Sequence, residues 1–411
     1  MRRIRSILLV VVPLVGILSI VAWNEASRLE RARYLMASGQ FAEARSQLGR
    51  YLSWFPDDAA ARMNMAEALI KDESQTEAHV IRIAIGHLEH AQTDPVFHVA
   101  AGIQAGRLQF LLLSQPFDAE HRFRDVLQAE PENYETNRLM WKLLDVTMRA
   151  HLSEPYFWQC YEHAIRADRP DLLRDWYLSQ FSPGTANASL DHMMGIQSPD
   201  ESPHARIELR RLARFRDKQM NWPQAHAAFA AWCHLEGAHE LAREALDESI
   251  ESARDDPFYL ATVILVRINS GDFDAAQAAF GHWPESDRGF DYWKSRGLVF
   301  EEVRGDDRDA ADAFERALKI WPGHCDASLQ HRRSNCLMRL GRKDEAAECR
   351  EAASRVDALM ELDLHTRLRR LLVDLTSRKT LTEMVEFYRH LGRQREADEW
   401  QNLATQTSPN E

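Results

Sequence analysis

A chain of 411 residues is long enough for two or three ordinary domains or for one elongated array of repeats, so it can bury a large core. Hydrophobic residues make up 45% of it and charged residues 28%, and 17 glycines with 15 prolines exclude collagen-like, disordered and turn-rich all-β chains. The formal net charge of −12, from 51 Lys and Arg against 63 Asp and Glu, disfavours a nucleic-acid binder, because phosphate binding needs a basic surface. We therefore expect an acidic, helical protein that binds no nucleic acid.

The first 24 residues have a basic start followed by an apolar run, and no acidic residue occurs before Glu25. The run from Ile7 to Trp23 holds 17 residues without a charge, at the short end of the roughly 17–25 that a transmembrane helix needs. It is preceded by three cations, Arg2, Arg3 and Arg5. By the positive-inside rule, residues 1–24 are expected to form a cytoplasmic stub and a single membrane anchor at residues 7–23, with the rest of the chain outside the cytoplasm.

A cleaved signal peptide is the alternative interpretation of this segment, because it shares the basic start. Its apolar region is usually about 7–15 residues long and ends at an A-x-A-like site. Here the residue two positions before Ala22 is Ile20 rather than a small residue, so the segment matches a cleavage site poorly. Both interpretations place the body of the chain in the periplasm or at the cell surface.

A period of 34 residues recurs in the second half of the chain. It relates a glycine, an alanine five positions later and a large apolar residue four positions after that alanine. Three copies keep this spacing: Gly237, Ala242 and Leu246; Gly271, Ala276 and Phe280; and Gly305, Ala310 and Phe314. Two more copies show its first two positions: Gly341 with Ala346, displaced by 36 residues, and Gly39 with Ala44 near the N-terminus.

These residue types suit a helical hairpin. Glycine adopts the left-handed turn between two helices, alanine lets the second helix approach the first, and the large residue fills the layer between repeats. One hairpin cannot bury its apolar stripe alone, so neighbouring hairpins must stack into a solenoid.

The pattern resembles the tetratricopeptide repeat (TPR) family, whose units are 34 residues long. The unit within residues 38–58 carries several of the family's positions: Gly39, Phe41, Ala44, Leu48, Tyr51 and Pro56. The resemblance covers about 32–131 and 205–355, whereas 132–204 and 356–405 depart from the pattern. It implies an all-α, right-handed superhelical solenoid of bacterial type, preceded by the anchor, that binds a protein or peptide in its concave groove.

Composition and repeat phase divide the chain further. After the anchor we expect an N-terminal helical block at 25–180 and a C-terminal block at 206–355. Between them, residues 181–205 hold three prolines and two glycines and predict a loop or linker. Residues 356–405 are expected to form a helical cap over the open end of the array, and 406–411 a frayed tail.

A basic helix face is expected at the start of the C-terminal block. Arg206, Arg210 and Arg214 recur at i, i+4 and i+8 in an otherwise acidic body. Such a face in a solenoid groove can capture a carboxylate or an acidic peptide through the bidentate geometry of arginine. The alternative is a solvated outer face that pairs with Glu208 and Asp217. We take the three arginines as the candidate partner-binding residues.

The sequence contains no P-loop, no G-x-G-x-x-G, no G-x-S-x-G and no H-E-x-x-H motif. Two clusters of metal-type side chains lack the three or four convergent ligands of a metal site: His87 with His90, and His324 and Cys325 with His331. We therefore expect no catalytic residue, metal, cofactor or small-molecule substrate. A less favoured alternative keeps an enzymatic or metal site in residues 132–204, where the repeat pattern fails.

Together these features predict a membrane-anchored TPR scaffold or adaptor that binds a protein or peptide partner and is not an enzyme. The first repeat follows the anchor closely, which would hold the groove near the bilayer and favours a role in the assembly or maintenance of envelope complexes. The alternative is a secreted or periplasmic soluble TPR protein after signal cleavage.

Overall fold

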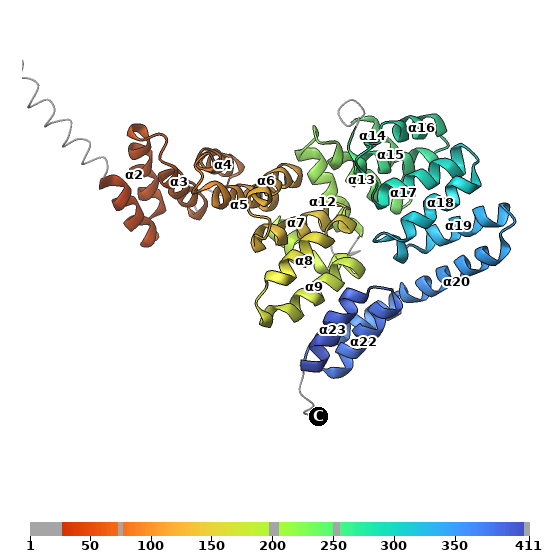
Figure 1. Ribbon diagram of the computed structural model, residues 1–411. Coiled ribbons are helices and arrows are strands. Elements are labelled where there is room, and N and C mark those ends of the chain that lie inside the picture. The colour runs from red at the N-terminus through yellow and green to blue at the C-terminus, as the bar shows by residue number, and fades with distance from the viewer. Residues whose placement is uncertain (1–26, 73–76, 197–204, 250–254, 407–411) are drawn as a thin grey trace, which may run out of the picture. The chain divides into compact units, whose positions relative to one another are not determined.

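The computed structural model describes residues 27–72, 77–196, 205–249 and 255–406, and every regular element within these ranges is a helix (Figure 1). The expected all-α fold is thereby confirmed. The anchor expected at residues 7–23 lies outside the described residues. Across the described ranges, no helix is both long and apolar enough to span a membrane.

The chain divides into two compact units, residues 1–136 and 137–411, so the boundary falls before the linker expected at 181–205. The first unit opens with a helix over residues 27–37. The elements that follow in it are α2 (Phe41–Trp54), α3 (Ala59–Lys71), α4 (Ala78–Gln92), α5 (His98–Arg107), the π-helical η1 (Leu108–Leu112) and α6 (Pro116–Ala129). Helix α7 (Tyr134–Val146) crosses the boundary between the units.

The second unit continues with helices of mostly three to four turns. Its first part holds η2 (Ala150–Leu152), α8 (Glu154–His163), η3 (Arg166–Asp168), α9 (Arg169–Phe181), α10 (Pro183–Ala186), α11 (Ala188–Met193), α12 (Ala205–Lys218), α13 (Pro223–Leu235) and α14 (His239–Asp247). Its second part holds α15 (Pro257–Asn269), α16 (Phe273–Gly281), α17 (Phe290–Leu298), η4 (Val299–Val303), α18 (Asp307–Leu318), η5 (Gly323–Cys325), α19 (Ala327–Arg339), α20 (Lys343–Leu359), α21 (Leu362–Leu371), α22 (Arg378–His390) and α23 (Gln394–Gln406).

Left-handed turns join the two helices of a hairpin. Six glycines in such turns have φ between 66° and 80°: Gly39, Gly237, Gly271, Gly305, Gly341 and Gly392. The first shows the typical closing bond, because the Gln40 N–H donates to the Leu35 carbonyl at 2.9 Å. Five positions after each of these six glycines an alanine is fully buried: Ala44, Ala242, Ala276, Ala310, Ala346 and Ala397. At the large apolar position, Phe314 is fully buried and Phe280 half-buried.

One hairpin with the same geometry, α7 with α8, lies in the stretch where the sequence pattern fails. Met148 takes the place of the turn glycine with φ 63°, and the Arg149 N–H donates to the Leu144 carbonyl at 3.0 Å. Ser153, five positions after Met148, and Phe157, nine positions after it, are fully buried, like Ala310 and Phe314 in their hairpin. The sequence pattern misses this repeat because methionine and serine replace glycine and alanine, although a left-handed methionine is uncommon.

Two hairpins, one in each unit, contain a π-helical turn, which adds one residue to an α-helix. Segments η1 and η4 follow directly on α5 and α17. Each begins two residues after a glycine on which a phenylalanine of the next helix packs: Gly106 with Phe123, and Gly297 with Phe314. A Cβ on either glycine would lie 2.3 Å from the phenylalanine ring, so both helices approach more closely than any larger residue allows.

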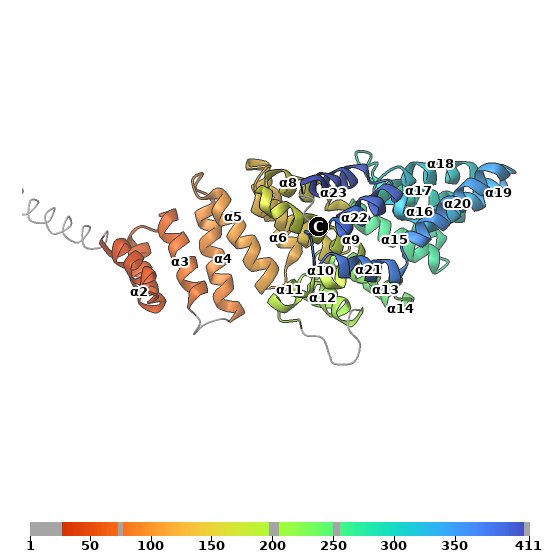
Figure 2. The same cartoon turned by 90° about the horizontal axis from the view of Figure 1, so that it is seen from below.

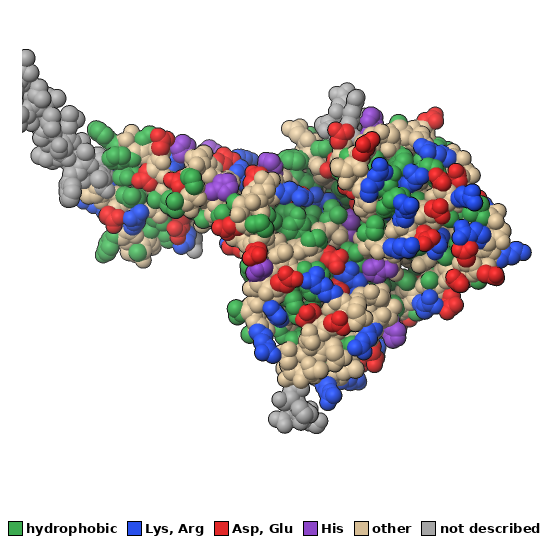
Figure 3. Space-filling view, in the orientation of Figure 1, with side chains coloured by type: hydrophobic (Ala, Val, Ile, Leu, Met, Phe, Trp, Pro, Cys, Tyr) green, Lys and Arg blue, Asp and Glu red, His purple; other side chains and the backbone are tan. Residues whose placement is uncertain are grey.

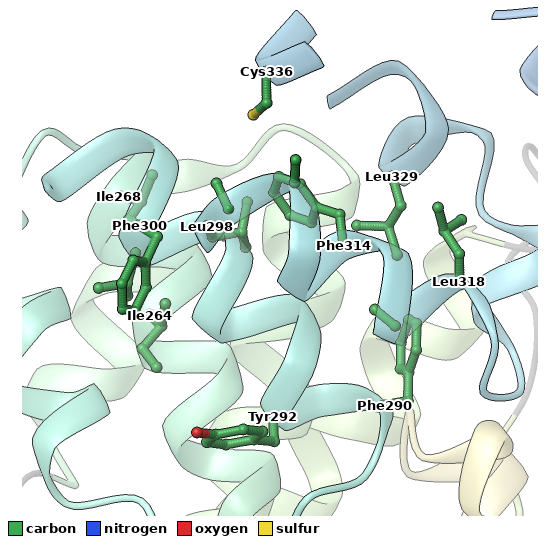
Figure 4. Close-up of a cluster of buried hydrophobic side chains, with 14 of the residues drawn as sticks. Ile264, Ile268, Phe290, Tyr292, Leu298, Phe300, Phe314, Leu318, Leu329 and Cys336 are labelled. Carbon is green, nitrogen blue, oxygen red and sulfur yellow. The ribbon is translucent and has the colours of Figure 1, made fainter. Parts of the chain in front are cut away.

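One hydrophobic core cluster of the second unit runs through helices α15 to α20 (Figure 4). Ile264 and Ile268 of α15, Leu298 of α17 and Phe314 of α18 are buried in one continuous apolar layer. Leu329 and Cys336 of α19 extend the layer into the next hairpin. The stacking of hairpins that the repeat implies is therefore what builds this core.

The C-terminal helices return to the beginning of the second unit. Both views place α22 and α23 beside α8 and α9 (Figures 1 and 2), and α23 contacts α9. Leu368 and Leu372, at the end of α21, are buried. The stretch expected to cap the array at 356–405 thus packs on residues about 200 positions upstream as well as on its neighbours.

We predict that Gly297→Ala lowers the free energy of unfolding by about 1–3 kcal/mol, because the new Cβ forces Phe314 from its place in a close-packed layer. The matched control is Gly281→Ala in α16, where a Cβ meets nothing within 4 Å and the change should stay within about 0.5 kcal/mol. Urea unfolding followed by circular dichroism measures both, and equal effects would contradict the close-approach argument.

Candidate functional site

The three candidate arginines do not form one open basic face. Arg210 of α12 is exposed, whereas Arg214 is half-buried and donates to the Met194 carbonyl at 2.5 Å. The side chain of Arg206 lies outside the described residues. Arg210 and Arg214 therefore differ in solvent exposure, and the guanidinium of Arg210 is the more accessible of the two.

The arginine between them, Arg211, is the most deeply buried charge of the helix, and sequence reasoning missed it. It donates to both oxygens of Asp191, at 2.7 and 2.9 Å, and lies 3.8 Å from Glu208. All three side chains are nearly inaccessible to solvent. This triad fastens α11 to α12, which explains why residues 183–193 are helical although we expected a loop at 181–205. Spacing alone gave no signal, because a buried ion pair depends on tertiary neighbours.

Figure 3 shows acidic and basic side chains interspersed over the visible face of the second unit, without a large patch of one sign. Within this unit, seven titratable side chains from four stretches of the chain form a set of ion pairs that we call the seam: His151, Glu154, Asp291, Lys294, Asp326, Arg393 and Glu396.

At one end of the seam, His151 Nε2 lies 2.8 Å from Asp291 Oδ2, and both side chains are largely buried. One helical turn further along α17, Lys294 Nζ donates to Asp326 Oδ2 at 3.0 Å. Burial alone would raise the pKa of Asp291, but the His151 ring and the Lys294 ammonium outweigh it and hold that pKa below its ordinary value. Burial would likewise raise the pKa of Asp326, but the Lys294 ammonium, the main neighbouring cation, helps to hold that pKa below its ordinary value.

At the other end, Arg393 joins the C-terminal helices to α8 and to the loop after α18. Its guanidinium donates to Glu154 Oε1 at 2.8 Å and to Glu396, and it lies 4.0 Å from the centre of the Trp321 ring. Burial, with the guanidinium beside it, lowers the pKa of His324 to about 4. His324 is therefore neutral at physiological pH.

A second buried group, Asp145 of α7, lies in the stretch 132–204 where the alternative hypothesis placed an enzymatic or metal site. Among the described residues neither of its carboxylate oxygens has a hydrogen-bond partner. The nearby hydroxyls of Ser153 and Ser179 donate instead to backbone carbonyls, at 2.6 and 2.9 Å. Burial raises the pKa of Asp145 to about 7, against the opposing charge of Lys142.

The two histidines of the first metal-type cluster singled out in the sequence have ordinary partners. His90 Nε2 lies 3.2 Å from Asp57, and His87 Nδ1 lies 3.2 Å from the Arg62 guanidinium. Over the part of the chain that the structure describes, no three His, Cys, Asp or Glu side chains are arranged to hold a metal ion. Burial raises the pKa of the Cys325 thiol to about 12, which keeps it protonated and a poor nucleophile.

We predict that the wild type loses stability relative to Asp145→Asn as the pH rises from about 4 to 7. In this window the unfolded chain releases the Asp145 proton, whose ordinary pKa is 3.8, while the folded chain keeps it to about 7. The pH-dependent part of the difference is small at pH 4 and reaches about 4 kcal/mol above pH 7. Urea unfolding at pH 4.5, 6 and 8 measures it, and a pH-independent difference would contradict the assignment.

We also predict that Arg211→Ala costs about 3–5 kcal/mol, because buried Asp191 loses the guanidinium that pairs with both of its oxygens. Its neighbour Arg210 is exposed, so Arg210→Ala should change the free energy of unfolding by about 0.5 kcal/mol or less. Chemical denaturation of the two variants gives the comparison. Similar losses for both would show that burial of the triad is not what stabilises α12.

Comparison with known proteins bears on the fold. Residues 35–80 match the family model described as tetratricopeptide repeat. No curated protein matches the chain. Three similar solved structures are the APC/C hetero-tetramer Cut9-Hcn1 (13% identity, TM-score 0.37, 95% of this chain and 88% of that chain covered), a tetratricopeptide repeat protein from Parabacteroides merdae ATCC 43184 (12%, 0.31, 80% and 98%) and the TPR domain of P58(IPK) (16%, 0.27, 94% and 100%). The TPR resemblance found in the sequence is thus confirmed for residues 35–80, and the helical hairpins form a TPR-like array.

Proposed function

We propose that this protein is a membrane-anchored TPR-like scaffold or adaptor that binds a protein or peptide partner and performs no chemistry itself. The observation that carries the proposal is the succession of hairpins with left-handed glycine turns and buried alanines. Stacked hairpins create a long surface on which side chains from several helices contact one partner. The tetratricopeptide repeat match at 35–80 supports the same function.

The proposal places the anchor at residues 7–23 and the repeat body outside the cytoplasm, close to the membrane. It rests on the basic start and the uncharged run of the sequence. A scaffold held in this way would serve the assembly or maintenance of envelope complexes. Arg210, exposed on α12, is proposed as one contact for an acidic partner segment.

The test is affinity capture with the full-length chain, tagged at its C-terminus and extracted from membranes in mild detergent. The wild type should recover a defined protein, and Arg210→Glu should recover several-fold less of it, because the substitution places a carboxylate opposite an acidic partner. The matched control is Arg308→Glu, an exposed arginine on α18. Equal recovery by the two variants would remove Arg210 from the binding surface.

Mass spectrometry of the purified N-terminus tests the anchor separately. An intact segment 1–24 in a membrane fraction that resists carbonate extraction is the expected result. A mature chain that lacks this segment would replace the anchored scaffold with the secreted or periplasmic form.

A further inference from the structure

The C-terminal end of α2 presents two neighbouring aromatic side chains to solvent. Trp54, the last residue of the helix, is 54% exposed, and Phe55, which follows it, is 36% exposed. Arg50 lies one helical turn before Trp54 and is also exposed, so the guanidinium and the indole share one side of the helix. Such a pair suits the headgroup level of a membrane, where the ring meets the edge of the hydrocarbon and the cation meets phosphate groups.

The backbone that carries the two rings is well ordered by its neighbours. The Phe55 N–H donates to the Tyr51 carbonyl at 3.0 Å, and the ring centres of Tyr51 and Phe55 lie 4.8 Å apart. The Tyr51 hydroxyl donates to Asp58 Oδ2 at 2.6 Å, while Asp58 Oδ1 accepts from the Ala61 N–H and caps α3. The aromatic pair is therefore held out from the start of the next hairpin.

The charges around the rings leave one cation available. The two carboxylates that follow Phe55 have partners, because Asp58 binds the Tyr51 hydroxyl and Asp57 Oδ1 lies 3.2 Å from His90 Nε2. Arg50 forms no ion pair with any carboxylate among the described residues. Its guanidinium is therefore free to bind a lipid phosphate.

Hairpin geometry places Trp54 at the end of the first repeat that leads to the N-terminus of the chain. The helix over residues 27–37 and α2 are joined by the turn at Gly39 and run antiparallel. Their register is fixed where Arg28 donates to Gln47 Oε1 at 2.9 Å. Trp54 lies seven residues beyond Gln47, which carries it about 10 Å further in the direction of the segment before residue 27.

The length of chain before this helix then limits how far Trp54 can lie from the bilayer. Three residues separate Trp23, the end of the uncharged run, from Ser27. Four steps of about 3.8 Å allow at most about 15 Å between these two residues. If residues 7–23 span the bilayer as proposed, the first repeat starts within or just above the headgroup region, and its end with Trp54 is directed toward the lipid.

We propose that Arg50, Trp54 and Phe55 form a lipid-contact surface that docks the first repeat on the headgroup region of the bilayer beside the anchor. The inference rests on the proposed anchor at residues 7–23 and extends it to a second membrane contact. The two rings enter the boundary between headgroups and acyl chains, and the Arg50 guanidinium pairs with a lipid phosphate. Docking of this kind fixes the orientation of the first repeat, which a flexible tether alone leaves free.

The test uses the full-length chain in vesicles of phosphatidylcholine with one-third phosphatidylglycerol. A fluorophore attached at Trp54→Cys should be quenched several-fold more by lipids with a nitroxide on the headgroup than the same fluorophore at Gln40→Cys. Gln40 is the exposed N-cap residue of α2 and lies at its other end, about 21 Å away along the helix. The native thiols interfere little, because four are buried and burial raises the pKa of Cys325 to about 12.

The variant Arg50→Glu tests the charge. Combined with the fluorophore at Trp54→Cys, it should lower the quenching several-fold, because a carboxylate at this place is repelled by the anionic surface. The matched control is Arg82→Glu, an exposed arginine near the start of α4, which should leave the quenching unchanged. Both arginines are exposed, so neither substitution should unfold the chain.

Four results would overturn the proposal. A chain that resists carbonate extraction but shows no quenching at residue 54 would exclude the docking and leave the anchor. A chain that carbonate extracts and that shows no quenching would exclude both. Equal quenching of the Arg50→Glu and Arg82→Glu variants would show that Arg50 does not contact the lipid. Energy transfer between copies labelled at residue 54, in place of quenching by lipid, would make a second copy of the chain the occupant.

Discussion

The structure depends on one constraint: a helical hairpin exposes an apolar stripe that it cannot bury by itself. Each hairpin must therefore present a small residue where the next helix crosses and a large one where the next hairpin stacks. Fully buried Ala310 and Phe314 show both parts in one repeat, with Gly297 drawn against the phenylalanine ring. The turn geometry is equally strict, since the backbone becomes left-handed even where the turn residue is Met148.

A stack of hairpins has two open ends, and the second unit closes one of them on itself. Helices α22 and α23 pack on α8 and α9 through buried aromatic rings, such as Tyr177 of α9 against Phe387 of α22, as well as through hydrogen bonds and ion pairs. Apolar contact gives an array its stability, whereas buried polar contacts help to specify which surfaces meet. The closing contact thus combines both kinds of interaction.

Buried charge lies both in the stretch where the repeat pattern fails and within the repeats. Asp145 lies without a hydrogen-bond partner among the described residues of α7 to α9, Arg211 fastens α11 to α12, and the seam joins four stretches of chain. Each site carries an energetic cost that an apolar side chain would avoid. The consequence is a dependence of stability on pH and on single charges.

The sequence by itself determined the helical class, the period of 34 and the turn glycines, because these follow from local spacing and from the preference of glycine for left-handed backbone. It could not reveal the hairpin with Met148 and Ser153, since residue type there departs from the pattern while geometry does not. It predicted Arg206, Arg210 and Arg214 as one set, yet only the fold decides that Arg211 is buried and Arg210 exposed. The return of α23 to α8 and α9 was equally invisible, because that contact joins residues more than 200 positions apart and depends on how the intervening hairpins stack.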